Sequence, residues 1–166
     1  MKKIITICCS ASFYSQALEV EKELKKLGFK VKIPSTAYKM KKNNNFDVSF
    51  YKTWYSNKSD YKRKTKLMKA HFLKVLAADV ILVLNYEKNG VPGYIGGNGL
   101  MEMMLAFLHK KPIFIYNKIS DELNIAEEVY GLNPIFIDQD LRIIMKKLKW
   151  KRRKTYKEEL IILGWL

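Results

Sequence analysis

The chain has 166 residues, a mass of 19.5 kDa and a pI near 9.7, a length that corresponds to a single domain. Hydrophobic residues make up 48% of it and charged residues 28%, so it can bury a sizeable core, which excludes a wholly disordered or fibrous protein. The 31 Lys and Arg residues outnumber the 16 Asp and Glu residues. The resulting charge of +15 favours an anionic partner: nucleic acid, a phosphorylated metabolite or an anionic membrane.

The longest apolar run, residues 75–84, contains Asp79 and is far shorter than the roughly 20 residues that a membrane-spanning helix needs. We therefore expect no membrane insertion. The only two cysteines, Cys8 and Cys9, are neighbours on a predicted strand and point to opposite faces, so we expect reduced thiols and a cytoplasmic location. Two histidines far apart and one cysteine pair give no metal-ligand spacing, and we expect neither a metal nor a cofactor.

Hydrophobic periodicity predicts alternating strands and helices along the chain. The first is the β-branched strand 4–9, followed by the helix 15–27, which Gly28 ends. A half-buried strand from Phe29 to Ile33 then ends at Pro34. The later predicted elements are helix 64–77, strand 80–84, helix 97–109, strand 113–116, helix 121–130, strand 134–137 and a helix from 138 towards 150.

This alternation is typical of βαβ units, and it predicts an α/β fold: a flavodoxin-like or Rossmann-like five-stranded parallel sheet with helices on both faces, in three layers. Ligands of such sheets bind at the carboxyl ends of the strands where the strand order reverses, beside the first and third strands. The rule selects the loops 9–14 and 85–98, of which Asn85 begins the second.

We expect residues 1–166 to form a single domain. Two segments of it depart from the alternation of strands and helices. Residues 34–60 are basic and aromatic without firm periodicity, and we expect a long loop that acts as a lid or is disordered. Residues 150–166 are first basic and then apolar, and we expect this tail to pack on the core or on a neighbouring subunit.

The strongest local pattern is the glycine-rich run that leads into Glu102, Gly93-Tyr94-Ile95-Gly96-Gly97-Asn98-Gly99-Leu100-Met101-Glu102. Glycines bring backbone N–H groups close to a ligand and open a helix whose amino end favours an anion. The alternative interpretation is a plain connection whose Glu complements the helix dipole. The run is neither a dinucleotide fingerprint nor a P-loop, which argues against hydride transfer and ATP hydrolysis.

Four blocks of sequence, taken in order, resemble the nucleoside 2-deoxyribosyltransferase-like superfamily, which includes the deoxynucleoside 5′-monophosphate N-glycosidases. The blocks are Ile-Cys-Cys-Ser-Ala-Ser-Phe at 7–13, Ala-Asp-Val-Ile-Leu-Val-Leu-Asn at 78–85, Gly96-Gly97-Asn98-Gly99 leading into Glu102 and Ala106, and Lys-Pro-Ile-Phe at 111–114. The resemblance extends from residue 4 to about residue 148. It implies cleavage or transfer of the base of a deoxynucleoside or its 5′-monophosphate.

The resemblance also implies the site. Glu102 matches the nucleophile, which attacks C1′ and forms a covalent glycosyl–enzyme as in retaining glycoside cleavage. Ser10, Ala11 and Ser12 match the loop against the sugar and its 5′ substituent, with Phe13 or Tyr14 at the base. Asn85 and the run Gly96, Gly97, Asn98 and Gly99 complete the expected substrate-binding set, in which backbone amides hold a phosphate. For Ser10 and Ser12 helix capping is the competing interpretation.

His71 departs from the family pattern, because an Asp that orients the nucleophile is expected at this position. A histidine there could donate a proton to the leaving base or position Glu102, since its ordinary pKa near 6.5 suits that role. The alternatives are a boundary residue of the core or a loss of the chemistry.

The cytokinin-activating phosphoribohydrolases offer a second, weaker resemblance through Pro-Gly-Gly-x-Gly-Thr-x-x-Glu, which this chain matches only with one residue fewer and without the Thr. The competing functional hypothesis is a catalytically idle module of the same fold that binds a nucleotide or, less favoured, nucleic acid through basic and aromatic residues. The resemblance implies a homodimer or larger assembly. Between 75 and 109 the only Lys or Arg is Lys88, and the excess positive charge lies in residues 38–74 and 142–157, where it could steer a nucleotide anion inward or be plain surface.

Overall fold

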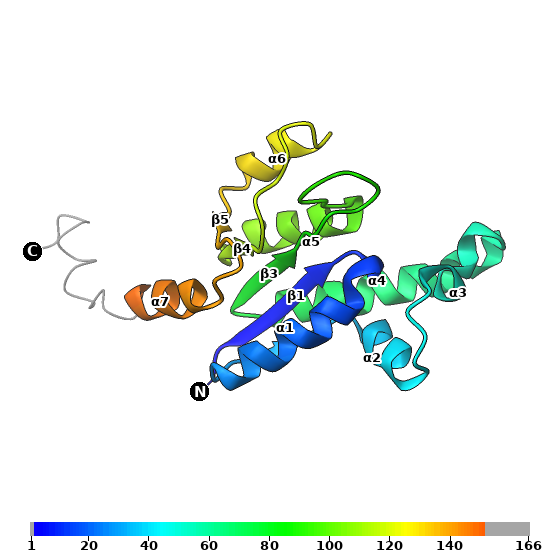
Figure 1. Ribbon diagram of the computed structural model, residues 1–166, viewed down its shortest axis with the longest axis horizontal. Helices are drawn as coiled ribbons and strands as arrows, with labels where there is room; N and C mark the ends of the chain where they lie inside the picture. The colour runs from blue at the N-terminus through cyan, green and yellow to red at the C-terminus, as the bar shows by residue number, and fades with distance from the viewer. Residues whose placement is uncertain (1, 152–166) are drawn as a thin grey trace, which may run out of the picture.

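The computed structural model describes residues 2–151, which form one five-stranded parallel sheet in the order β2-β1-β3-β4-β5 (Figure 1). The strands are β1 (Ile4–Cys9), β2 (Lys30–Lys32), β3 (Val80–Leu84), β4 (Ile113–Ile115) and β5 (Ile135–Phe136). The central pair is in register with Cys8 opposite Val83. This topology confirms the predicted flavodoxin-like fold class, in which the strand order reverses between β1 and β3.

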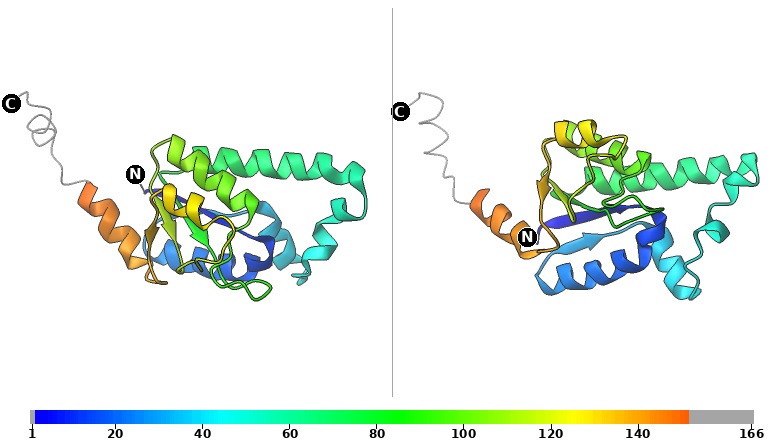
Figure 2. Two further views of the ribbon diagram at one scale, coloured as in Figure 1. Left: turned by 90° about the horizontal axis from the view of Figure 1, so that it is seen from above. Right: turned by 45° about the horizontal axis from the view of Figure 1, so that its top comes forward.

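Helices cover both faces of the sheet (Figure 2). On one face, α1 (Tyr14–Lys26) and α7 (Arg142–Lys151) contribute Leu24 and Ile144 to a core cluster. On the other face, α4 (Tyr61–Leu76), α5 (Gly97–Leu108) and α6 (Ala126–Gly131) form a second cluster, which contains Val75, Met103 and Val129. All five residues of β3 are buried because both of its faces are covered, which explains its uninterrupted apolar sequence.

Residues 34–60 differ from the predicted loop. They fold into α2 (Ser35–Lys42), α3 (Val48–Tyr51) and the 3₁₀ turns η2 (Thr53–Tyr55) and η3 (Lys58–Asp60), which lead to the start of α4. These helices are too short for a periodic signal. Side-chain caps begin two of them, α3 and η3, where the Asp47 carboxylate and the Asn57 amide oxygen accept hydrogen bonds from the backbone N–H groups of Ser49 and Ser59. Figures 1 and 2 show α4 extending beyond the carboxyl ends of the strands, with α3 at its far end and α2 nearer to the sheet.

Two predicted helices are shorter in the structure. The helix expected over 121–130 is α6, which begins only at Ala126 after a turn. The helix expected from 138 begins at Arg142, because Asp138 and Gln139 have positive φ angles of 42° and 66°, which a helix does not allow. The predicted tail 150–166 lies outside the described residues from 152 onward.

Asp79 has a structural role before β3, where its carboxylate accepts hydrogen bonds from the Ile4 N–H at 2.7 Å and the Lys3 ammonium at 2.8 Å. Within residues 2–151, no helix combines the length and apolar character that crossing a bilayer requires.

Candidate functional site

A cavity of about 280 Å³ opens at the carboxyl ends of β1 and β3, where the strand order reverses. Its walls come from the loop after β1, the segment α2–η2, the inner face of α4, and the loop that leads from β3 into α5. Among the predicted site residues, those that line it are Ser10, Ala11, Tyr14, His71, Gly96, Gly97, Asn98, Gly99 and Glu102. Ser12, Phe13 and Asn85 do not.

Glu102 lies on the inner face of α5, one and a half turns after the helix begins at Gly97, and is only 7% exposed. The loop that leads into α5 packs closely against the backbone near Lys118. Gly93 has a φ of +64°, and a Cβ there would overlap the backbone oxygen of Lys118, so only glycine fits. The first N–H groups of a helix have no acceptor within the helix. In α5 no side chain caps them either, since Gly96 precedes the helix in an extended conformation, and Gly97, Asn98 and Gly99 line the cavity.

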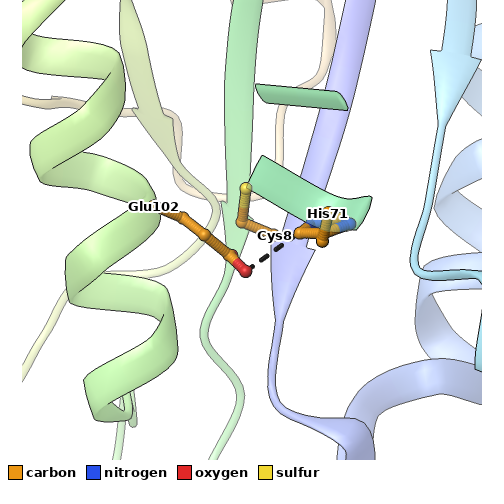
Figure 3. A group of neighbouring side chains, drawn as sticks. All are labelled: Cys8, His71 and Glu102. Atoms are coloured by element: carbon orange, nitrogen blue, oxygen red, sulfur yellow. Dashed lines mark ion pairs between the residues drawn. The ribbon is translucent and has the colours of Figure 1, made fainter. Parts of the chain in front are cut away.

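His71 reaches the same cavity from α4, and its Nε2 lies 3.8 Å from Oε1 of Glu102 (Figure 3). It is also only 7% exposed. Both ring nitrogens are buried and neither makes a hydrogen bond of normal geometry, although the backbone of Ile7 lies close enough to influence the ring. The structure therefore brings together the two residues predicted to carry the chemistry, and it leaves the imidazole free to interact with something other than the protein.

Burial shifts the pKa values of these two groups in opposite directions. It raises the pKa of Glu102 to about 7, against the opposing effects of the Cys8 thiol and the charge of Lys64. It lowers the pKa of His71 to about 4, with a further contribution from the charge of Lys74 and a small opposing one from the backbone of Ile7. His71 is therefore neutral at pH 7, and the 3.8 Å approach is not a salt bridge there.

The loop after β1 presents fewer residues to the cavity than the sequence predicted. Ser10 accepts a hydrogen bond from the Ser12 N–H at 3.4 Å and so caps η1 (Ala11–Phe13), in agreement with the capping interpretation, yet it also lines the cavity. Ser12 is exposed outside the cavity. Phe13 is buried and packs edge-on against Tyr86.

Asn85 is fully buried and joins the ends of two neighbouring strands. Its side chain accepts a hydrogen bond from the Asn117 N–H at 2.7 Å and donates to the Asn117 carbonyl at 2.9 Å. Its position at the end of β3 is as predicted, but these bonds give it a structural role and leave it outside the cavity wall.

The sequence reasoning missed the lysines of the cavity. Lys52, Lys64, Lys74 and Lys88 all line it, and the first three come from the segment before β3 that carries much of the excess charge. Nζ of Lys64 lies 3.3 Å from Oδ1 of Asn98, and Nζ of Lys88 lies 3.4 Å from Oγ of Ser10. The segment 75–109 is poor in lysine, but lysines of the preceding basic segment join it at the cavity, which agrees with the alternative that the excess charge steers an anion inward.

Across the part of the chain that the structure describes, none of these lysines forms a salt bridge. Instead, Lys52 has a lowered pKa, first through burial and then through repulsion by Lys88 and Lys64. The cations are thus gathered against their mutual repulsion, and an anion in the cavity would relieve it.

Aromatic side chains accompany the lysines. Lys64 lies over the ring of Trp54 at 5.7 Å, and Lys88 over the ring of Tyr94 at 4.7 Å. Tyr51, Trp54 and Tyr55 all line the cavity from the segment that was expected to be a loop. The aromatic and basic composition of this segment indicated that it could contact a nucleotide, but the sequence did not show that it folds against the cavity.

Cys8, His71 and Glu102 are the residues here that could hold a metal ion, with one ligand atom of each within 4.8 Å of the others. No sequence spacing indicated this group, because its members come from β1, α4 and α5. Burial raises the pKa of the Cys8 thiol, and the charge of Glu102 raises it further.

No protein-family model and no curated protein sequence matches the chain at a significant level.

Proposed function

We propose that the protein cleaves the N-glycosidic bond of a deoxynucleoside or deoxynucleoside 5′-monophosphate, or transfers its base, with Glu102 as the nucleophile. The observation that carries the proposal is the buried carboxylate of Glu102 in a cavity at the strand ends, beside His71. The resemblance to the nucleoside 2-deoxyribosyltransferase-like superfamily, which assigns the same role to this Glu, supports it.

In the proposed reaction, a carboxylate oxygen of Glu102 attacks C1′ and forms an ester as the C1′–N bond breaks. The electron pair of that bond leaves with the base, which takes up a proton from water. Water then attacks C1′ of the ester, releases the free sugar and a proton, and restores the carboxylate; in a transferase, a second base takes the place of this water. A pKa of about 7 leaves roughly half of the Glu102 carboxyls ionised at neutral pH, and low solvation favours their reactivity.

We assign His71 as a positioning residue for Glu102. Because its pKa is about 4, the imidazole is neutral at pH 7 and is a poor source of a proton for the base. A neutral imidazole can still donate a hydrogen bond to a carboxylate, and the separation of 3.8 Å needs to shorten by about 1 Å for that bond to form. His71 would then do the orienting work that the family pattern gives to an Asp.

The lysines favour the phosphorylated form of the substrate. A 5′-phosphate would face Lys52, Lys64 and Lys88 together with the free N–H groups at the start of α5. Tyr51, Trp54 and Tyr55 offer aromatic faces on which a base can stack. The cavity volume, about 280 Å³, is close to the lower end of small-molecule sites.

The second candidate is a catalytically idle module that binds a nucleotide or single-stranded nucleic acid. It is favoured by the rings of Phe50 and Tyr55, which are 62% and 73% exposed, and by Lys52, whose Nζ lies 5.9 Å from the centre of the Tyr55 ring. Titration of single-stranded DNA binding against salt tests it, since binding that depends on counterion release weakens steeply as salt rises.

We further propose that the protein is cytoplasmic and acts on its nucleotide as a homodimer or larger assembly. Exposed apolar side chains on neighbouring helices, Leu73 on α4 and Met104 and Leu108 on α5, support the assembly. Sedimentation at several concentrations measures it.

The decisive experiment incubates the purified protein with a panel of deoxynucleosides and their 5′-monophosphates and measures released base by chromatography. We expect release from at least one member, and none from the Glu102→Gln variant. No release from any member at high enzyme concentration would leave the binding module as the better description.

A further inference from the structure

We propose that Cys8, His71 and Glu102 form a binding site for a transition-metal ion such as Zn²⁺. The three side chains converge from β1, α4 and α5, and one ligand atom of each lies within 4.8 Å of the others (Figure 3). All three are buried, with exposed fractions of 0%, 7% and 7%. They are therefore a compact group of donors shielded from bulk water.

The imidazole supplies independent support, because both of its nitrogens are buried without a hydrogen bond of normal geometry, the nearby backbone of Ile7 included. A buried polar group left unpaired costs about 1–3 kcal/mol, and native structures rarely tolerate it without a bound water, an ion or a functional reason. A metal ion between His71 and Glu102 would give one of these nitrogens a partner.

The distances suit a small ion after a modest adjustment. Ligand bonds of about 2.0–2.2 Å in a tetrahedral site place nitrogen and oxygen donors roughly 3.4 Å apart. Nε2 of His71 and Oε1 of Glu102 are 3.8 Å apart, already close to this separation. The whole group, within 4.8 Å, has to contract by at most about 1 Å, which side-chain rotation supplies.

The donor set selects the kind of metal. A thiolate and an imidazole favour Zn²⁺ and similar ions, whereas Mg²⁺ and Ca²⁺ require oxygen ligands. On binding, the Cys8 thiol releases its proton and the metal–sulfur bond forms. Three protein ligands leave a fourth position open, and His71 and Glu102 line the cavity through which the ion can enter.

The consequence for activity rests on the proposed function. An ion bound to the Glu102 carboxylate occupies the group that attacks C1′, so metal binding and glycosidic cleavage exclude each other. Zn²⁺ would therefore act as an inhibitor rather than a cofactor.

The test is titration of the full-length, chelator-treated protein with Co²⁺, a spectroscopic substitute for Zn²⁺, followed by near-ultraviolet and visible absorption. We expect one equivalent to produce a sulfur-to-cobalt charge-transfer band that Zn²⁺ abolishes and excess Mg²⁺ does not. Cys8→Ser should lose the band. His71→Ala should weaken Co²⁺ affinity by more than the roughly 10- to 100-fold that loss of an outer-shell partner costs.

Cys9→Ser is the matched control, because it removes the adjacent free thiol, which does not belong to the group. It should keep the band. Absence of the band in the wild type, or its persistence in Cys8→Ser, would overturn the proposal, and circular dichroism confirms that each variant is folded. Since absorption does not depend on turnover, this result stands apart from the success or failure of the glycosidase assay, in which Zn²⁺ inhibition should weaken in Cys8→Ser.

Discussion

The carboxylate of Glu102 and the imidazole of His71 face each other at 3.8 Å in surroundings that disfavour the charged form of both. The pKa of Glu102 is raised to about 7 and that of His71 is lowered to about 4, in each case mainly by burial. A proton taken up by the pair above pH 4 therefore resides on the carboxyl group. This order of the two pKa values is the reverse of that in an ordinary His–Glu ion pair, and it underlies the predictions for His71 and for the pH dependence of stability.

Replacing Glu102 by Gln should reduce base release by at least about 10³-fold, because an amide oxygen cannot form the glycosyl ester. Incubation with a 2′-fluoro-2′-deoxynucleoside, whose ester hydrolyses slowly, should add the mass of the sugar to the wild-type protein but not to Glu102→Gln. Glu122→Gln, at an exposed position, is the control and should retain both activity and labelling. Labelling at a residue other than Glu102 would contradict the assigned nucleophile.

Removing the imidazole in His71→Leu should lower kcat by about 100-fold and leave KM within about threefold, because the carboxylate loses its orientation rather than the substrate its contacts. The loss of a polar neighbour should also raise the pKa of Glu102 further, so the acidic limb of the kcat/KM profile moves to higher pH. His71→Asn, which keeps an N–H donor, should recover part of kcat. A profile that does not move in His71→Leu would indicate a purely structural role.

The two shifted pKa values have opposite effects on stability. The folded protein holds a proton on Glu102 between pH 4.5 and about 7 that the unfolded chain releases, so this group's contribution is lost as the pH rises through that window. The folded protein resists protonation of His71 between pH 6.5 and about 4, so this group's contribution is lost as the pH falls. Each group changes the free energy of unfolding by an amount on the order of 3 kcal/mol across its pH window. Where the two windows overlap, the opposite pH dependences largely cancel.

Urea unfolding of single variants between pH 4.5 and 7 should therefore show the pH dependence of each group separately. Relative to the wild type, His71→Leu should lose free energy of unfolding as the pH rises, and Glu102→Gln should gain it. The exposed control Glu122→Gln should follow the wild-type curve. Parallel curves for all four proteins would show that burial does not shift these groups as described.

Lys64→Gln and Lys88→Gln should each raise KM for a 5′-monophosphate by about 10-fold, which corresponds to the loss of one charged hydrogen bond. KM for the free deoxynucleoside should change by less than about twofold. Lys66→Gln, exposed on the same helix as Lys64 and outside the cavity, is the control and should behave as the wild type. Equal losses with both substrates would mean that the lysines do not bind the phosphate.

Gly93→Ala should destabilise the protein by several kcal/mol, because the new Cβ meets both a φ of +64° and the backbone of Lys118. Gly90→Ala measures the cost of the positive φ alone, since Gly90 has a φ of +78° but open space around it. It should lower the free energy of unfolding by only about 1 kcal/mol. Thermal unfolding measures both. Equal effects would mean that the loop moves away from Lys118 to accept the methyl group.

Local patterns in the sequence were sufficient to predict the architecture and one half of the site. The apolar runs at β1 and β3 and the helices between the strands show clear periodicity, from which a parallel α/β sheet and its two ligand-facing loops were predicted; the observed strand order fits the flavodoxin-like fold expected. Glu102 was singled out because the glycines that open α5 lie next to it in the chain, and its role as nucleophile was implied by the family resemblance.

Tertiary packing alone decided the rest. Lys64 and Asn98 are 34 residues apart, and Lys88 and Ser10 are 78 apart, so no local pattern could place lysines in the cavity or show that the segment 34–60 folds beside it. The group of Cys8, His71 and Glu102 likewise depends on which faces α4 and α5 turn toward β1. Periodicity identifies the buried face of a helix, but the partner across that face is set by how the elements pack. The sequence by itself therefore determined the sheet and its nucleophile candidate, and the structure determined the charge around the cavity and the neighbours of that carboxylate.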